Sequence, residues 1–219
     1  MNDDEPLWYV AYGSNLFRER FRCYLAGGRP EGGARSQAGC RDPRPARAEQ
    51  SITVPGGIYF AHHSRTWGGG TAFYDPDLPG RAAARAYLLT RRQFCDVLSQ
   101  EMHRPVGVDH DLSEALRHGR QRIGPGRYET VLKVGERGGC PMLTFTSPEP
   151  GPPNAPTAAY LAMLGGGLRE AHGWTAERAA SYLAGRPGAR GAWTPEGIAG
   201  LLRPGSPRRG GLGSSHERR

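Results

Sequence analysis

Residues 8–16 read WYVAYGSNL and contain a change of pattern around which the rest of the chain can be interpreted. The apolar run from Leu7 to Tyr12 is rich in aromatic and branched side chains, which predicts a buried strand. Gly13 ends this run, and Ser14 and Asn15 are residue types that commonly cap the N-terminus of a helix. The stretch therefore predicts a strand, a tight glycine turn and the start of a helix.

A helical pattern follows the turn. Large apolar side chains recur at helical spacing, while charged side chains occupy the other face; the apolar positions are Phe17, Phe21, Tyr24 and Leu25. The first amides of a helix have no internal partner and carry partial positive charge. Because Gly13 allows close backbone approach, we expect a pocket for a carboxylate or phosphate here. A plain capped helix is the alternative, since the spacing of the glycine-rich nucleotide-binding motifs is missing.

The length and composition predict one loop-rich domain. The chain has 219 residues with 33 Gly and 19 Pro, which suffices for one good core. We expect a single domain over residues 1–203. Within it, residues 27–50 are rich in Gly, Arg and Pro and predict a long irregular loop. Residues 204–219 are of low complexity and predict a disordered tail.

The formal net charge of +8 does not predict a nucleic-acid partner. The arginines are scattered over the whole chain and form no basic stripe interleaved with aromatic side chains. Four cysteines lie far apart without a C-x-x-C motif, and no apolar run approaches the length of a membrane span. We therefore expect reduced thiols in a cytoplasmic protein with no membrane partner.

The remaining strand signals favour an α+β fold. Each is a short apolar or alternating run, and they cover residues 52–54, 58–62, 71–74, 82–89, 128–134 and 142–146. Most are joined by turns rather than helices. We expect a mixed, barrel-like sheet of about six or seven strands flanked by helices.

Helix signals occur once in the middle of the chain and again near its end. Thr90 and Gln93 match a capping box, and a second short helix is expected over residues 112–118. Near the C-terminus, helices are expected over residues 157–171 and 175–184 and from Thr194 onward. The run Gly165–Gly167 interrupts the first of these, and each glycine costs about 1 kcal/mol relative to alanine. We expect another backbone segment to pack closely against it.

Glu101 is the candidate for proton transfer. It shares one helix face with Phe94 and Leu98, so its carboxylate is expected on the buried side of the helix. Burial favours the protonated form of a carboxylate and suits it to general acid–base chemistry. The same pattern also allows Glu101, at the helix end, to bend into solvent or to pair with Arg104.

The string Tyr12–Leu16 behind an aromatic strand resembles the signature of the gamma-glutamyl cyclotransferase family. Residues 67–72, WGGGTA, and the Pro-rich segment 152–156 that leads to Tyr160 are similar to two further family segments. The resemblance implies that Glu101 is the one essential glutamate. It also implies a set of substrate-binding residues: Tyr12, Gly13, Ser14, Asn15, Leu16, Phe17 and Tyr160.

The activity implied by this resemblance needs no cofactor and no metal. The α-amine of a γ-glutamyl amide attacks its own γ-carbonyl, which releases 5-oxoproline and a free amine. The expected partner is a small-molecule or peptide γ-glutamyl substrate, with the protein acting as a monomer or homodimer. Alternatives are an amide-processing or transfer enzyme on a γ-glutamylated compound, or a non-catalytic binding module on the same fold. A metal-dependent hydrolase ranks last, because His62 and His63 are adjacent on an expected strand and point to opposite faces.

Overall fold

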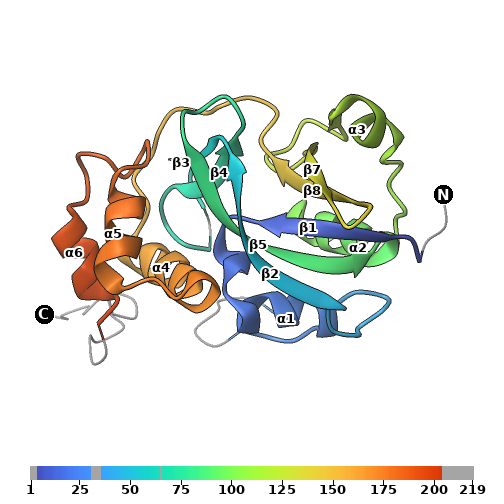
Figure 1. Cartoon of the computed structure of the whole chain (residues 1–219), viewed down its shortest axis with the longest axis horizontal. Coiled ribbons are helices and arrows are strands. Elements are labelled where there is room, and N and C mark those ends of the chain that lie inside the picture. Colours follow the sequence, from blue (N-terminus) through green and yellow to red (C-terminus); the bar gives the residue numbers. More distant parts are fainter. Residues whose placement is uncertain (1–3, 31–35, 65, 204–219) are drawn as a thin grey trace, which may run out of the picture.

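A mixed six-stranded sheet runs through the centre of the molecule (Figure 1). The computed structural model describes residues 4–30, 36–64 and 66–203. In spatial order the strands are β2 (Ala48–Pro55), β5 (Arg81–Thr90), β1 (Pro6–Ala11), β8 (Cys140–Thr146), β7 (Thr130–Arg137) and β6 (Arg120–Arg122). Strand β1 pairs antiparallel with β5 and parallel with β8. A separate two-stranded sheet contains β3 (Gly57–Ala61) and β4 (Thr71–Asp75).

The predicted α+β class and mixed sheet are confirmed, but the sheet is not closed into a barrel. Strands β2 and β6 stand at opposite ends of the strand order, and β3 and β4 pair with each other in their own sheet. Strand β6 was not predicted from the sequence, because its residues Arg-Gln-Arg carry no apolar alternation. Its antiparallel register with β7 depends on the backbone alone.

Strand β2 is longer than the sequence predicts and shortens the expected loop. Its first residues, Ala48–Gln50, were assigned to the irregular segment 27–50 because they are small or polar. They pair with β5 from Ala48 opposite Leu88 onward. The loop prediction is therefore wrong for these residues, since strand pairing uses backbone groups and does not require apolar side chains.

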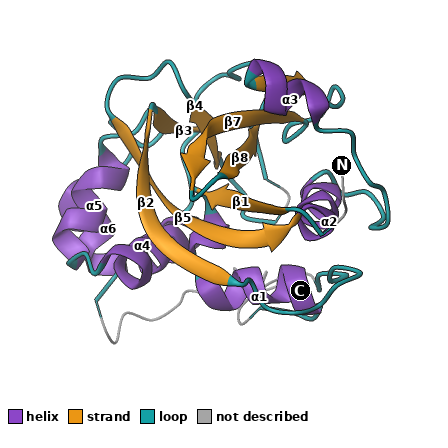
Figure 2. Ribbon diagram, turned by 45° about the vertical axis from the view of Figure 1, so that its right-hand side comes forward, coloured by secondary structure: helices purple, strands orange, loops and turns teal. Residues whose placement is uncertain are grey.

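Strand β1 is buried on both faces, which explains why its sequence is continuously apolar. Trp8 and Val10 pack into a core with the C-terminal helices. Leu7 and Tyr9 point the other way, into a second core with the two helices that follow β1 and β5. Alternation along one strand thus divides the molecule into two apolar layers, with helices on both sides of the sheet (Figure 2).

Threonine caps begin several helices, as the sequence predicts, but not all of them. The helices are α1 (Arg18–Ala26), α2 (Arg91–Glu101), α3 (Ser113–His118), α4 (Ala158–His172), α5 (Ala176–Ala184) and α6 (Pro195–Leu201). Thr90 and Gln93 form the predicted capping box of α2. Thr157, Thr175 and Thr194 cap the last three helices with their side chains.

The start of α1 differs from the prediction. Ser14 and Asn15 do not cap it; they belong to a short 3-10 turn, η1 (Ser14–Leu16). Phe17 occupies the N-cap position of α1 and makes no side-chain cap hydrogen bond. The 3-10 turn η1 therefore stands between β1 and α1. The side chains of Asn15 and Ser14 bond partners elsewhere in the fold and not the first amides of α1.

The glycine run of α4 lies against η1, as the sequence leads us to expect. A Cβ atom on Gly167 would come within 2.7 Å of the Leu16 Cβ and 2.9 Å of the Phe17 amide nitrogen. A Cβ on Gly165 would meet the Leu202 side chain at 2.5 Å. Glycine at these positions allows η1 and the end of α6 to approach the α4 backbone directly.

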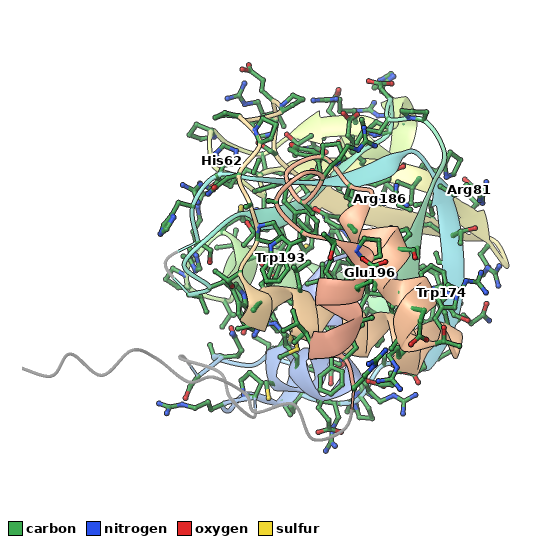
Figure 3. The ribbon with its side chains drawn as sticks, turned by 90° about the vertical axis from the view of Figure 1, so that its left-hand side faces the viewer. His62, Arg81, Trp174, Arg186, Trp193 and Glu196 are labelled. Carbon is green, nitrogen blue, oxygen red and sulfur yellow. The ribbon has the colours of Figure 1, made fainter. Side chains whose placement is uncertain are left out.

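Helices α5 and α6 form one end of the molecule, seen face-on in Figure 3. Trp193, between these helices, donates from Nε1 to the carbonyl of Pro156 at 2.9 Å. This bond joins the C-terminal helices to the segment that precedes α4. The bond therefore fixes the loop between α5 and α6 to the N-terminal end of α4.

Two predictions involve residues outside the described ranges. The tail 204–219 lies outside them, as do residues 31–35 of the expected loop.

In the described part of the chain no helix is long and apolar enough to cross a membrane. The four cysteines are free thiols.

Candidate active site

A cavity opens where β1 ends and η1 begins. It is small, with a volume of about 30 Å³ that a water molecule can enter. Its lining comes from β1, η1, β4, α2, β8 and α4 and from the segment before β7: Tyr9, Tyr12, Gly13, Ser14, Asn15, Ala72, Glu101, Tyr128, Phe145 and Tyr160. Residues far apart in the chain therefore meet at the glycine turn that the sequence singled out.

Glu101 and Asn15 are in direct contact across this cavity. The Asn15 side chain donates from Nδ2 to Glu101 Oε1 at 2.9 Å, although 86 positions separate the two residues. Asn15 is only 3% exposed and is fixed from two more sides. Its Nδ2 also donates to the Tyr9 hydroxyl at 3.2 Å. The main-chain carbonyl of Asn15 accepts from the Tyr87 hydroxyl at 2.9 Å. A rigid amide thus orients the carboxylate.

The two positions that the sequence allowed for Glu101 are now distinguished. Glu101 is the last residue of α2 and is partly buried at the cavity wall. Arg104 pairs instead with Glu129, at 2.7 Å. The carboxylate of Glu101 is therefore directed to the cavity. Of the described residues in the lining, Glu101 is the one acidic side chain.

Tyrosine hydroxyls surround this carboxylate and stay neutral. Burial, followed by the nearby Glu101 carboxylate, raises the pKa of Tyr9 and of Tyr24 well above the ordinary value. Burial also raises the pKa of Tyr160. A buried phenol beside a carboxylate does not ionise at neutral pH, so these groups can act only as neutral hydrogen-bonding partners.

The glycine turn itself leaves two amides for a ligand. Within η1, the Leu16 amide donates to the Gly13 carbonyl at 2.9 Å and the Phe17 amide to the Ser14 carbonyl at 3.2 Å. Within the described part of the chain, the hydrogen bonds of η1 do not use the amides of Ser14 and Asn15. Successive free amides in such a turn suit an anionic oxygen.

Gly13 serves the cavity rather than the turn geometry. Its φ of −103° is negative, so a left-handed backbone is not what requires glycine here. A Cβ atom at this position would lie 3.6 Å from the Tyr160 hydroxyl and 4.0 Å from the Ala72 Cβ. A side chain here would therefore meet ordinary contacts but would occupy space inside the cavity.

The two other segments that carried the family resemblance lie against each other. The Gly70 amide donates to the Ala155 carbonyl at 2.9 Å, and the Thr157 hydroxyl donates to the Trp67 carbonyl at 2.9 Å. The Ala72 amide in turn donates to the Tyr160 hydroxyl at 3.1 Å. The contacts place Tyr160 at the cavity, opposite Gly13.

Not every expected substrate-binding residue reaches the cavity. The structure brings together Tyr12, Gly13, Ser14, Asn15, Glu101 and Tyr160. Leu16 is not in the lining, because it is buried in the core against α4, and Phe17 is also outside the lining.

Four lining residues were missed by sequence reasoning: Tyr9, Ala72, Tyr128 and Phe145. Tyr9 stands in the quoted stretch and Ala72 in the glycine-rich segment, so a signal existed for both. For Tyr128 and Phe145 the sequence carries no such signal. Phe145 is in β8, which lies beside β1 through a long-range parallel pairing, and Tyr128 is in the segment before β7. As for a metal site, the described ranges contain no group of three His, Cys, Asp or Glu side chains placed to bind an ion.

Comparisons with known proteins give matches of two kinds. No protein-family model matches the chain. A curated relative, histone deacetylase 5 of Arabidopsis thaliana, is 31% identical over 198 residues, which cover 81% of this chain. The chain spans only 30% of the length of that protein.

Two solved structures are also similar to the chain, both at 18% sequence identity. A gamma-glutamyl cyclotransferase has a TM-score of 0.48, and the match covers 90% of this chain and 98% of that one. The uncharacterized protein loc79017 from Homo sapiens has a TM-score of 0.43, and the match covers 77% and 81%. The family named from the sequence motif is thus represented among the structures found.

Proposed function

We propose that this chain is a cofactor-free enzyme of the gamma-glutamyl cyclotransferase type, with Glu101 as its general acid and base. One observation carries the proposal: Asn15, within the Tyr-Gly-Ser-Asn turn, holds the Glu101 carboxylate at 2.9 Å on the wall of a small cavity. A turn suited to an anion and an oriented carboxylate are the two elements that the reaction requires.

The reaction uses a nucleophile that is already part of the substrate. The α-nitrogen of the γ-glutamyl group attacks the γ-carbonyl carbon, a new C–N bond closes the five-membered ring, and the original amide C–N bond breaks. The protein has mainly to hold a folded substrate conformer, because tethering removes much of the entropy cost of bringing the groups together.

Glu101 moves the protons in this scheme. Its carboxylate takes a proton from the α-ammonium and later returns one to the departing nitrogen. Over the whole reaction the α-nitrogen loses two protons. One passes through Glu101 to the departing nitrogen, and the other goes to the released amine, or to solvent where that amine stays neutral, so the reaction balances without a cofactor. The Asn15 amide holds Oε1 of Glu101 in place, and the other carboxylate oxygen would carry the proton.

The amides of Ser14 and Asn15 have the complementary role. Ser14 and Asn15 line the cavity, and their amides would bind the substrate α-carboxylate or the oxyanion that forms at the γ-carbon. Tyr160 and Ala72 bound the space opposite Gly13, and Tyr160 would hydrogen-bond the substrate.

The test is the variant Glu101→Gln, assayed by release of 5-oxoproline and free amine from a panel of γ-glutamyl amides. Glutamine keeps an acceptor for Asn15 but cannot carry the proton, so turnover is expected to fall about 10²- to 10⁴-fold. Glu114→Gln is the control, because Glu114 is an exposed acid on α3 paired with Arg117. Its turnover should equal that of the wild type.

The outcomes separate the alternatives. Wild-type-like turnover by Glu101→Gln would show that another group transfers the proton. Release of amine without 5-oxoproline, in the presence of a second amine, would point to the transfer reaction. Failure of the wild type to process any panel member would leave the binding-module function as the better description.

A further inference from the structure

Arg20 is a buried cation next to the candidate active site. It lies in the first turn of α1 and is only 7% exposed. Its guanidinium makes no ion pair with a described acidic residue. Arg85, which is also buried, is paired with both Glu49 and Glu170. Burying a charge is strongly unfavourable unless an anion is near it. The Glu101 carboxylate is linked to Arg20 only through the Tyr24 hydroxyl, so the guanidinium has no direct anionic partner among the described residues.

The guanidinium of Arg20 lies directly behind the cavity wall. Its Nε donates to the Ser14 hydroxyl oxygen at 2.9 Å, and its Nη2 lies 3.4 Å from the Tyr24 hydroxyl. Its carbon Cζ sits 5.6 Å from the centre of the Trp67 ring, which in turn lies 5.2 Å from the ring of Tyr160. Ser14 and Tyr160 line the cavity, so Arg20 contacts the lining directly at Ser14 and through Trp67 at Tyr160.

The bond from Arg20 also sets the direction of the Ser14 hydroxyl. A serine hydroxyl has one donor and two acceptor positions. Because Arg20 occupies an acceptor position, the hydroxyl proton is left to donate, and the side chain lies in the cavity lining. The turn therefore presents the Ser14 hydroxyl and the two amides of Ser14 and Asn15, with a full positive charge behind them.

Glu101 provides the opposite charge on the other side of Asn15. The Tyr24 hydroxyl lies between the two charges: Glu101 acts to raise its pKa and Arg20 to lower it. The same two residues act in opposite directions on the pKa of Tyr160. The site thus has a positive side at Ser14 and a negative side at Glu101. The head of a free α-amino acid carries a carboxylate and an ammonium on one carbon, which is the matching arrangement.

We propose that Arg20 is a specificity-determining residue that, acting through Ser14, restricts the site to γ-glutamyl compounds with a free α-carboxylate. The inference rests on the proposed function and adds to it a substrate class. Compounds whose γ-glutamyl unit has its α-carboxyl group tied in an amide or peptide bond are poor substrates. The site recognises the α-carboxylate and α-ammonium of the substrate by their charges. It selects less strictly among the amines bonded to the γ-carbonyl carbon.

The experiment compares two substrates with the same leaving group. One is a γ-glutamyl anilide with a free α-carboxylate, and the other is the same anilide with an α-carboxamide. For the wild type we expect kcat/KM to favour the carboxylate on the order of 10- to 100-fold, the range for hydrogen bonds to a charged group. Arg20→Gln should lose most of this preference while its kcat/KM on the carboxamide stays close to wild type.

Arg22→Gln is the matched control. Arg22 lies on the same helix, is exposed and pairs with Glu19, so its removal changes the net charge equally without reaching the cavity. It should keep the full preference. Arg20→Lys retains the charge and should restore part of it. Ser14→Ala removes the linking hydroxyl and should weaken the preference even if Arg20→Gln does not fold.

A purely structural role would reduce kcat/KM on both anilides equally, and that result would overturn the inference. An unchanged preference in folded Arg20→Gln or in Ser14→Ala would overturn it as well. If the wild type turns over neither anilide, the proposed function fails, and the inference is judged by calorimetric binding of free glutamate against its α-amide. Tighter binding of glutamate by the wild type, lost in Arg20→Gln, would still support recognition of the α-carboxylate by Arg20. Equal binding of glutamate and its α-amide by the wild type would refute that recognition.

Discussion

Replacement of Gly167 by alanine tests whether α4 positions the catalytic turn. The glycine belongs to a helix, so alanine gains about 1 kcal/mol of intrinsic helix stability. The new Cβ would lie 2.7 Å from the Leu16 Cβ, 2.9 Å from the Phe17 amide nitrogen and 3.0 Å from the Leu16 carbonyl carbon. Two of these atoms are backbone and cannot rotate away. The turn η1 must therefore move by several tenths of an ångström.

The neighbouring glycine provides an internal comparison. A Cβ on Gly166 would meet only the Phe17 ring, at 4.0 Å, which is ordinary contact. Gly166→Ala keeps the helix gain without the collision, so the propensity term cancels between the two variants. The remaining difference is the overpacking cost of about 1–3 kcal/mol. At about 2–4 °C per kcal/mol for a chain of this size, Gly167→Ala should melt several degrees below Gly166→Ala.

Activity should separate the two variants further. Asn15 belongs to η1, and its hydrogen bond to Glu101 depends on the position of that turn. A shift approaching 1 Å can reduce turnover by up to about 10²-fold. Thermal melting and kcat/KM on one γ-glutamyl amide are the measurements. Equal melting temperatures and equal kcat/KM for the two variants would refute the view that α4 holds the turn in place.

Two further predictions concern the cavity and the buried histidines. The Cβ of Gly13→Ala would make contacts of 3.6 Å or more and would lie inside the cavity, so KM should rise more than kcat falls. A purely kcat effect in steady-state kinetics would contradict this. Burial, with a smaller contribution from Arg104, lowers the pKa of His110 from its ordinary 6.5. As the pH falls, His110 is therefore protonated in the unfolded chain before it is protonated in the folded one, so the free energy of unfolding should fall below about pH 6.5. Urea melts at pH 7.5 and 5.5 measure this fall, which should be smaller for His110→Gln than for the wild type.

Much of the fold could be predicted from the sequence because the responsible interactions are local. Thr90 and Gln93 satisfy the first amides of α2 within a few residues of each other. The continuous apolar run before Gly13 predicts a strand buried on both faces, and β1 is such a strand. The glycine run in α4 predicts close backbone contact, although it does not say with which segment. These features depend on short-range periodicity and capping, which the residue order contains directly.

Only the tertiary structure decided which partners the side chains of the motif contact. The hydrogen bond between Asn15 and Glu101 joins residues 86 positions apart, and it exists because β1 and α2 pack in the same core layer. The same packing sends Ser14 and Asn15 to Arg20 and Glu101 instead of to the helix cap that their residue types suggest. It also turns Leu16 into the core, and it leaves the sheet open at β2 and β6. A capping residue has several partners of similar energy available, and the choice among them is made by the long-range packing that places each partner within reach.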